Sequence, residues 1–148
     1  PCYASASPCG DLFRASLAFG AVLILRVPDI QSGQEQLSRY LQLQPSQLDG
    51  SSDFLYQINR QRTSRVDEVI GINRLTKWSI MRGGGIALEV GPDAIRRLAS
   101  DSVVACRLEL DMNTQADRSV PINSSQIGAI LEELVEYGNE ISEKGDVS

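Results

Sequence analysis

Alternating apolar and polar positions run through four segments of the chain. Successive side chains of a β-strand point to opposite faces, so this alternation predicts strands with one buried face. A fifth segment, 19–27, is almost continuously apolar and ends at Pro28, which is typical of a central strand buried on both faces. The four alternating strands are expected at 53–62, 69–82, 86–90 and 103–113.

Three consecutive glycines, 83–85, separate two of these segments, 69–82 and 86–90. Glycine supplies the positive φ angles of tight hairpin turns, so the sequence predicts a hairpin here. A phosphate-binding loop is a poorer interpretation, because such loops lead from a strand into a helix and this one leads into another strand pattern.

Apolar residues at helical spacing predict three helices. The first covers 32–43 with Ser32 as its N-cap, and the second is a short helix over 93–99. The last follows a cap at Ser124 or Ser125 and carries an acidic outer face. The order β-α-β-β-β-α-β-α, with short connections, predicts an α+β fold. We expect a mostly antiparallel sheet of four to five strands with two to three helices packed on it.

The length of 148 residues fits one domain with a substantial core. We expect this domain to span 12–144. Residues 1–11 are expected to be a disordered tail or a segment foreign to the native protein, and 145–148 a frayed acidic tail. The uncharged stretch 15–25 is shorter than the roughly 20 residues of a membrane helix. We therefore expect a soluble, cytoplasmic protein that does not enter a membrane.

Histidine is absent, which removes the usual general base and the commonest metal ligand. Serine or cysteine catalysis with a histidine base is thereby excluded within one chain. Cys106 lies in a strand pattern and is expected to be a small buried hydrophobe. The redox state of Cys2 and Cys9 stays open, although three cysteines argue against a disulfide framework. No cofactor is expected, and a non-enzymatic role is favoured.

The segment 54–82 is basic although the chain carries a net charge of −5. It contains the sequence Ile-Asn-Arg twice, at 58–60 and 72–74. One hypothesis is an anion or nucleic-acid surface, with arginines on phosphates and aromatic rings stacked on bases. The alternative is that Arg60 and Arg74 pair with the acidic helix at 132–143. The candidate residues are Tyr56, Arg60, Arg62, Arg65, Arg74, Lys77, Trp78 and Arg82.

Glu109 and Asp111 are two positions apart on a predicted strand and therefore share a face. Such carboxylate pairs hold Mg²⁺ in metal-dependent enzymes, and Glu89 on a neighbouring strand is a candidate third ligand. The simpler interpretation is a solvated strand face with Arg107 as a neighbour.

The function that these patterns favour is protein–protein interaction, as an adaptor, a chaperone-like protein or an immunity-type protein. The partner is expected to be another protein or a second copy in a homodimer. Strand edges within 54–90 are the expected pairing surface. Nucleic-acid or anion binding and a Mg²⁺-dependent enzyme are the alternatives.

Overall fold

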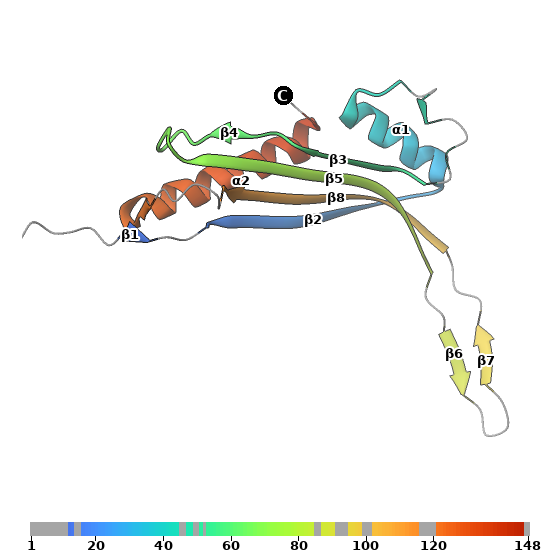
Figure 1. The fold of residues 1–148 in the computed structure, drawn as a ribbon. Helices are drawn as coiled ribbons and strands as arrows, with labels where there is room; N and C mark the ends of the chain where they lie inside the picture. Colours follow the sequence, from blue (N-terminus) through green and yellow to red (C-terminus); the bar gives the residue numbers. More distant parts are fainter. Residues whose placement is uncertain are drawn as a thin grey trace, which may run out of the picture.

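The computed structural model describes residues 12–13, 16–44, 47–48, 51, 53–84, 87–90, 95–98, 102–115 and 121–146. Within this part the chain forms two layers, an antiparallel sheet and a layer of two helices on one of its faces (Figure 1). The sheet has five strands: β2 (Ala18–Val27), β8 (Ser102–Thr114), β5 (Gly71–Gly84), β3 (Leu55–Asn59) and β4 (Arg62–Thr63). The helices are α1 (Ile30–Leu41) and α2 (Ile127–Lys144).

The strand order across the sheet is β2-β8-β5-β3, with β4 also paired to β5, and every pair is antiparallel. The predicted α+β class is therefore confirmed, although the predicted order of elements matches only roughly. Two small antiparallel pairs complete the described strands: β1 (Leu12–Phe13) with β9 (Ile122–Asn123), and β6 (Ala87–Val90) with β7 (Ile95–Leu98).

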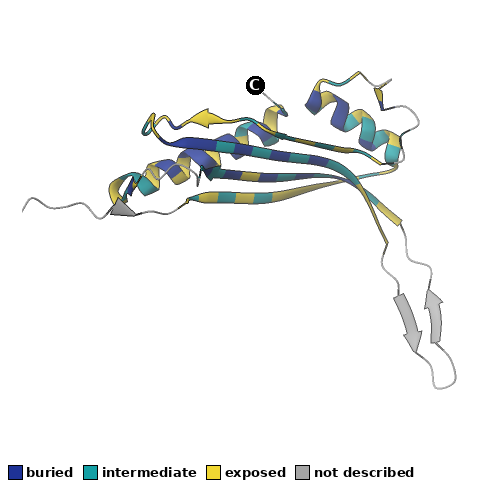
Figure 2. Ribbon diagram, in the orientation of Figure 1, coloured by how far each residue is buried: buried dark blue, intermediate teal, exposed yellow. Residues whose placement is uncertain are grey.

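The core lies between the sheet and the helices. Alternate residues of β8, among them Leu108, Leu110 and Met112, point toward the helices and are buried. Ile130 and Leu134 of α2 are fully buried against them. Figure 2 shows this pattern as alternating dark and light segments along β5 and β8. The alternation that predicted these strands thus reflects one face covered by helices and one left open.

The side-chain caps at the starts of the helical segments are not the predicted serines. Asp29, not Ser32, is the N-cap of α1, and its carboxylate accepts the Ser32 backbone N–H at 2.7 Å. A short 3₁₀ turn, Ser124–Gln126, precedes α2, and its cap is Asn123 instead of Ser124 or Ser125. An Asp or Asn oxygen satisfies the free N–H groups of a first turn as well as a serine does, so composition alone does not select the cap.

Two predicted features between β5 and β8 are wrong. Gly83 and Gly84 do not form a hairpin turn, because they belong to β5 and pair with Val103 and Ser102 of β8. The segment Ile95–Leu98, predicted as helix, is strand β7, paired with β6. The chain leaves the sheet after β5, makes the β6–β7 pair and returns as β8 (Figure 1). Long-range strand pairing has therefore overridden the local signals for a turn and a helix.

The apolar segment predicted as a central strand is β2, and this prediction is also wrong. β2 is an edge strand, paired only with β8 among the described strands. Figure 2 shows no fully buried position along it. A continuous apolar run is compatible with burial on both faces, but the described part of the chain covers neither face of β2 completely.

Candidate functional site

Among the described residues, no strand pairs with the outer side of β2, which leaves a row of its backbone groups without ladder partners. Thr114 N–H donates to Leu17 O at 2.9 Å, which makes these two opposite residues a hydrogen-bonded pair at the start of the β2–β8 ladder. In an antiparallel ladder such pairs alternate with non-hydrogen-bonded ones. The odd-numbered residues of β2 therefore bond to β8. The even-numbered residues point their N–H and C=O groups away from the sheet: Ala18, Gly20, Val22, Ile24 and Arg26.

Large aliphatic side chains surround this free edge. Val22, Leu23, Ile24 and Leu25 are 54%, 42%, 60% and 50% exposed. Val22 and Ile24 lie on the open face of the sheet, and Leu23 and Leu25 on the face that carries the helices. Natural edge strands are usually short, charged, bulged or interrupted by proline. β2 has ten residues, no proline, and Arg26 as its one charged side chain.

The opposite edge of the sheet has the protection that β2 lacks. β3 has five residues, and two residues outside any strand separate it from the two-residue β4. Arg60 N–H bonds to β5, so by alternation Leu55, Gln57 and Asn59 point their backbone groups outward. Two of these three carry polar amides. This edge is therefore a poorer template for a further strand than β2.

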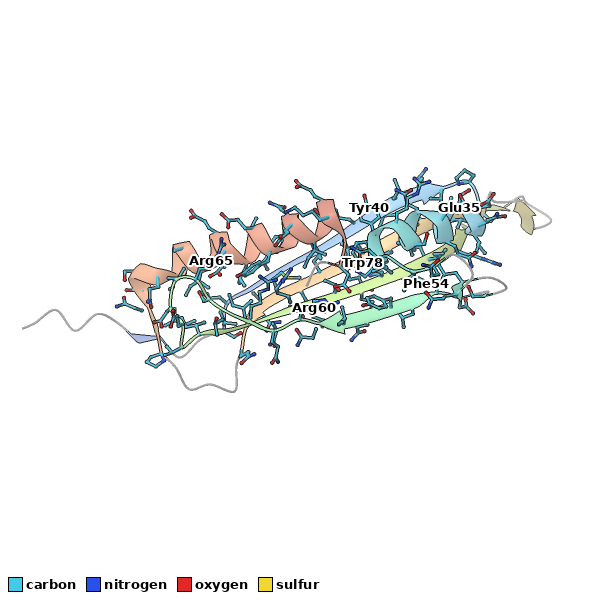
Figure 3. All side chains as sticks on the ribbon, turned by 90° about the horizontal axis from the view of Figure 1, so that it is seen from above. Glu35, Tyr40, Phe54, Arg60, Arg65 and Trp78 are labelled. Carbon is cyan, nitrogen blue, oxygen red and sulfur yellow. The ribbon has the colours of Figure 1, made fainter. Side chains whose placement is uncertain are left out.

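A hollow of about 290 Å³ opens beside the middle of β2 on the helix-covered face. Trp78 of β5 lies in it, stacked on Tyr40 of α1 with 5.6 Å between ring centroids. Figure 3 shows both rings between the ends of α1 and α2. The Trp78 indole N–H is buried and has no hydrogen-bond partner among the described residues. The other main lining residues are Leu23, Leu25, Leu37 and Leu108.

The basic residues of 54–82 do not gather on one surface. Arg74 is buried on the helix-covered face, and Lys77, an odd number of positions away, lies on the open face. Arg62 and Arg82 are exposed. Trp78 is buried, so its ring is not presented to solvent for stacking. The two Ile-Asn-Arg copies meet at one point, where Arg60 N–H, directly after β3, donates to Arg74 O of β5.

Arg60 binds Asp146, which lies just after α2. Its Nε and Nη2 donate to the two carboxylate oxygens of Asp146 at 2.7 and 2.8 Å, and Tyr56 Oη donates to the same carboxylate at 2.7 Å. The Arg60 guanidinium lowers the pKa of Asp146 and outweighs the opposite effect of burial. Asp146 N–H also donates to Tyr40 O at 3.1 Å. Asp146, expected in a frayed tail, thus fastens the end of α2 to β3 and α1.

Arg65 and the loop after β4 are anchored by Glu133 of α2. This buried carboxylate accepts four hydrogen bonds, from Ser64 Oγ, Arg65 N–H, Arg65 Nε and Tyr137 Oη, at 2.6 to 3.1 Å. Arg65 also pairs with the exposed Glu136. Burial raises the pKa of Glu133, but these hydrogen bonds outweigh it and hold the pKa below its ordinary value. A residue predicted as part of an acidic outer face is therefore an internal anchor.

Arg74 is 1% exposed and makes no hydrogen bond through its guanidinium within the described residues. Its nearest carboxylate is Glu140 of α2, with 4.0 Å between Nη2 and Oε2. Its guanidinium carbon lies 5.0 Å from the centroid of the Tyr137 ring, in a cation–π contact. Burial lowers the pKa of Arg74, and the charge of nearby Arg62 lowers it further.

The carboxylates considered as metal ligands have other partners. Glu109 lies between Lys77 and Arg107, at 3.0 and 2.7 Å. Asp111 accepts a hydrogen bond from Asn113 at 2.8 Å. The side chain of Glu89 lies outside the described residues. In the part of the chain with described side chains, no three His, Cys, Asp or Glu residues come together in a way that suits a metal ion.

Cys106 is buried beneath α1, and its thiol lies 3.5 Å from Gly33 O. Burial raises its pKa, which disfavours the reactive thiolate and is consistent with a structural role. Cys2 and Cys9 lie outside the described residues. None of the helices in the described ranges is long and apolar enough to cross a bilayer.

The described residues thus form a two-layer α+β sandwich in which no strand pairs with the outer edge of β2. No family model, no curated protein and no solved structure matches the chain. The sequence analysis placed the expected pairing surface within 54–90 and did not single out the edge of β2. The only signal for it was the apolar run itself, whose length and lack of charge also suit an interior strand.

Proposed function

We propose that this protein acts by protein–protein interaction, accepting a β-strand of its partner at the free edge of β2. The observation that carries the proposal is the ten-residue β2 edge, whose alternate backbone groups and four exposed aliphatic side chains have no cover in the described structure. Strand addition uses such features together, because main-chain hydrogen bonds give affinity and alternate side chains give specificity. Adaptor, chaperone-like and immunity-type roles all fit this mode of binding.

The energetics favour occupation of the edge. A large aliphatic side chain contributes roughly 1.5–3 kcal/mol when it is fully buried. The four side chains from Val22 to Leu25 are each about half exposed, so a strand beside them gains several kcal/mol of burial in addition to its ladder of hydrogen bonds. Part of this gain offsets the loss of freedom on association, which leaves a specific but moderate affinity.

The competing proposal, nucleic-acid or anion binding by the segment 54–82, has weaker support. Arg60, Arg65 and Lys77 each pair with a carboxylate of the same chain. A phosphate ligand must therefore compete with existing ion pairs. A Mg²⁺-dependent reaction at Glu109 and Asp111 faces the same competition, from Lys77 and Arg107.

A pair of matched variants tests the proposal. Ile24→Lys places a charge on the β2 edge at a 60% exposed position, and Leu55→Lys places one on the β3 edge at a 63% exposed position. Both residues lie on the open face, so the two changes differ mainly in which edge they charge. We expect Ile24→Lys to abolish association, whether with itself or with a protein retained from the source lysate. Leu55→Lys should associate as the wild type does.

Residue-resolved hydrogen exchange supplies the mechanism-specific measurement. In the free protein the odd-numbered amides of β2 should exchange slowly and the even-numbered ones, such as Val22 and Ile24, quickly. In the complex both sets should be slow, since the added strand accepts the outward N–H groups. Fast exchange of the even-numbered amides in every complex that forms, or equal binding by both lysine variants, refutes strand addition at β2.

A further inference from the structure

The alternation of inward and outward backbone groups along β2 allows two copies of the strand to pair with each other. We propose that the strand accepted at β2 is β2 of a second copy of this chain, antiparallel, with Leu23 facing the partner's Leu23. This inference rests on the proposed strand addition and names its partner. The outward backbone groups belong to even-numbered residues, so even residues must oppose even residues in a two-fold pairing. This condition is met when the two-fold axis passes midway between one residue and the same residue of the partner. It is not met when the axis lies between two consecutive positions of the strand.

Side-chain size selects the register centred on Leu23. On the helix-covered face Leu25 then lies opposite the partner's Ala21, so that a large side chain meets a small one. On the open face Ile24 lies opposite the partner's Val22. All four exposed aliphatic side chains thereby gain an apolar neighbour. A register centred on Val22 puts Ile24 opposite the partner's Gly20, and one centred on Ile24 puts Arg26 opposite the partner's Val22.

Charge complementarity supports the same register. Arg26 lies opposite the partner's Gly20, whose other neighbour across the ladder is Asp111 of β8 in its own chain. Arg26 and the partner's Asp111 are thus two strand spacings apart, about 10 Å between backbones. Glycine leaves the space between them empty, so an arginine and an aspartate side chain together can bridge it. Arg26 and Asp111 are both exposed on the open face. Because of the two-fold symmetry, the dimer contains this ion pair twice.

The pairing also encloses the hollow beside Trp78. An axis perpendicular to the sheet keeps the helices of both copies on one face, so the two sheets become one and the two hollows face each other across the seam. Leu23 and Leu25 form the rim of each hollow next to β2. The partner's Leu23 is therefore placed at the mouth of a hollow that no described residue closes at the sheet edge.

Cysteine cross-linking tests the register directly. In a background with Cys2→Ser, Cys9→Ser and Cys106→Ala, Leu23→Cys puts two thiols in a non-hydrogen-bonded pair with Cα atoms about 4.5 Å apart. A disulfide spans that distance. We expect mild oxidation to give a covalent dimer. Ala21→Cys or Leu25→Cys alone should give none, because each thiol is about 13 Å along the strand from its copy.

Mixing the Ala21→Cys and Leu25→Cys proteins provides a test without any change at Leu23. We expect a heterodimer to form on oxidation, at least tenfold in excess over either homodimer. Independently, Arg26→Glu and Asp111→Arg should each weaken the dimer several-fold by light scattering, and the double variant should restore it. Failure of the mixed cross-link, or of the charge-swap rescue, overturns this register.

The two proposals fail in different ways. If the protein stays monomeric at all concentrations but a foreign protein protects the even-numbered β2 amides and is lost with Ile24→Lys, the homodimer is wrong and strand addition stands. If a dimer forms and is unaffected by Ile24→Lys, both are wrong. Far-UV circular dichroism on each variant establishes that it is folded before its association is measured.

Discussion

Glu133 is a buried carboxylate whose removal should have a large and predictable cost. It is 3% exposed and accepts four hydrogen bonds from three residues, Ser64, Arg65 and Tyr137. Burial of a charge is unfavourable by itself, and it is the first influence on the pKa of Glu133. Because the pKa is nevertheless lowered, the hydrogen bonds exceed that cost and the fold favours the ionised form.

The substitution Glu133→Gln keeps the shape of the side chain and removes its charge. One oxygen can still accept from Arg65 and Tyr137, but these bonds become neutral acceptor bonds, which contribute less than bonds to a charged group. The new amide N–H also displaces the hydroxyl donated by Ser64. We expect a loss of about 2 kcal/mol in the free energy of unfolding at pH 7. Glu133→Ala leaves several buried donors without partners and should cost about 4 kcal/mol.

Urea unfolding followed by Trp78 fluorescence measures these losses. The matched control is Glu136→Gln, which removes the other carboxylate paired with Arg65. Glu136 is 63% exposed, so its loss should change stability by less than about 0.5 kcal/mol. An unchanged slope of free energy against urea concentration establishes that the variants unfold from similar states.

The pH dependence of the free energy of unfolding follows from the direction in which the pKa of Glu133 is shifted. The folded pKa of Glu133 lies below its ordinary value of 4.5, so its contribution is complete above that pH and is lost as the pH falls through the folded pKa. The stability difference between the wild type and Glu133→Gln should therefore shrink as the pH is lowered below 4.5. A variant as stable as the wild type at pH 7, or a difference that grows in acid, refutes the argument that hydrogen bonding exceeds desolvation here.

Two further predictions concern packing under α2. Gly138→Ala should destabilise the protein by about 1–3 kcal/mol, because the new Cβ lies 2.7 Å from a ring carbon of Phe19, and Phe19→Leu in the same chain should recover most of the loss in urea unfolding. Arg74→Met should leave stability unchanged or raise it, because the buried guanidinium has a 4.0 Å ion pair with Glu140 and a contact with Tyr137 but no hydrogen bond within the described residues. Thermal unfolding measures this change. A loss of stability above about 3 kcal/mol contradicts the prediction.

The strands of the sheet interior were predictable because half of each is buried. In β8 the inward residues Leu108, Leu110 and Met112 are buried, and the residues between them face the open side. The alternation of apolar inward residues and polar outward residues is a local property of the sequence, and it does not depend on which strands become neighbours. The same is not true of Gly83 and Gly84, where the pairing of β5 with β8 decides the conformation. Pairing over such a separation is invisible to a local pattern.

The partners of the arginines were equally hard to predict. The sequence left open whether Arg60 and Arg74 face solvent or the helices, because a one-residue change of register reverses the face of every side chain. The structure places Arg74 beneath Tyr137 and binds Arg60 to Asp146. Asp146 lies in a segment whose composition suggests a loose end, and its role depends on where α2 stops.

The sequence of β2 predicts a central strand, whereas the structure has β2 at an edge, and this difference has a physical meaning. The segment has the composition of a strand with neighbours on both sides and cover on both faces, yet within the described chain it has one neighbour. The same protein keeps its other edge short, interrupted and partly polar, in β3 and β4. Within the described residues, one sheet edge is thus short and partly polar, and the other is a ten-residue, aliphatic-rich strand with no paired strand on its outer side. The strand addition proposed above would account for both observations, because β2 would then be an interior strand of an assembly with the neighbours that its apolar sequence pattern predicts.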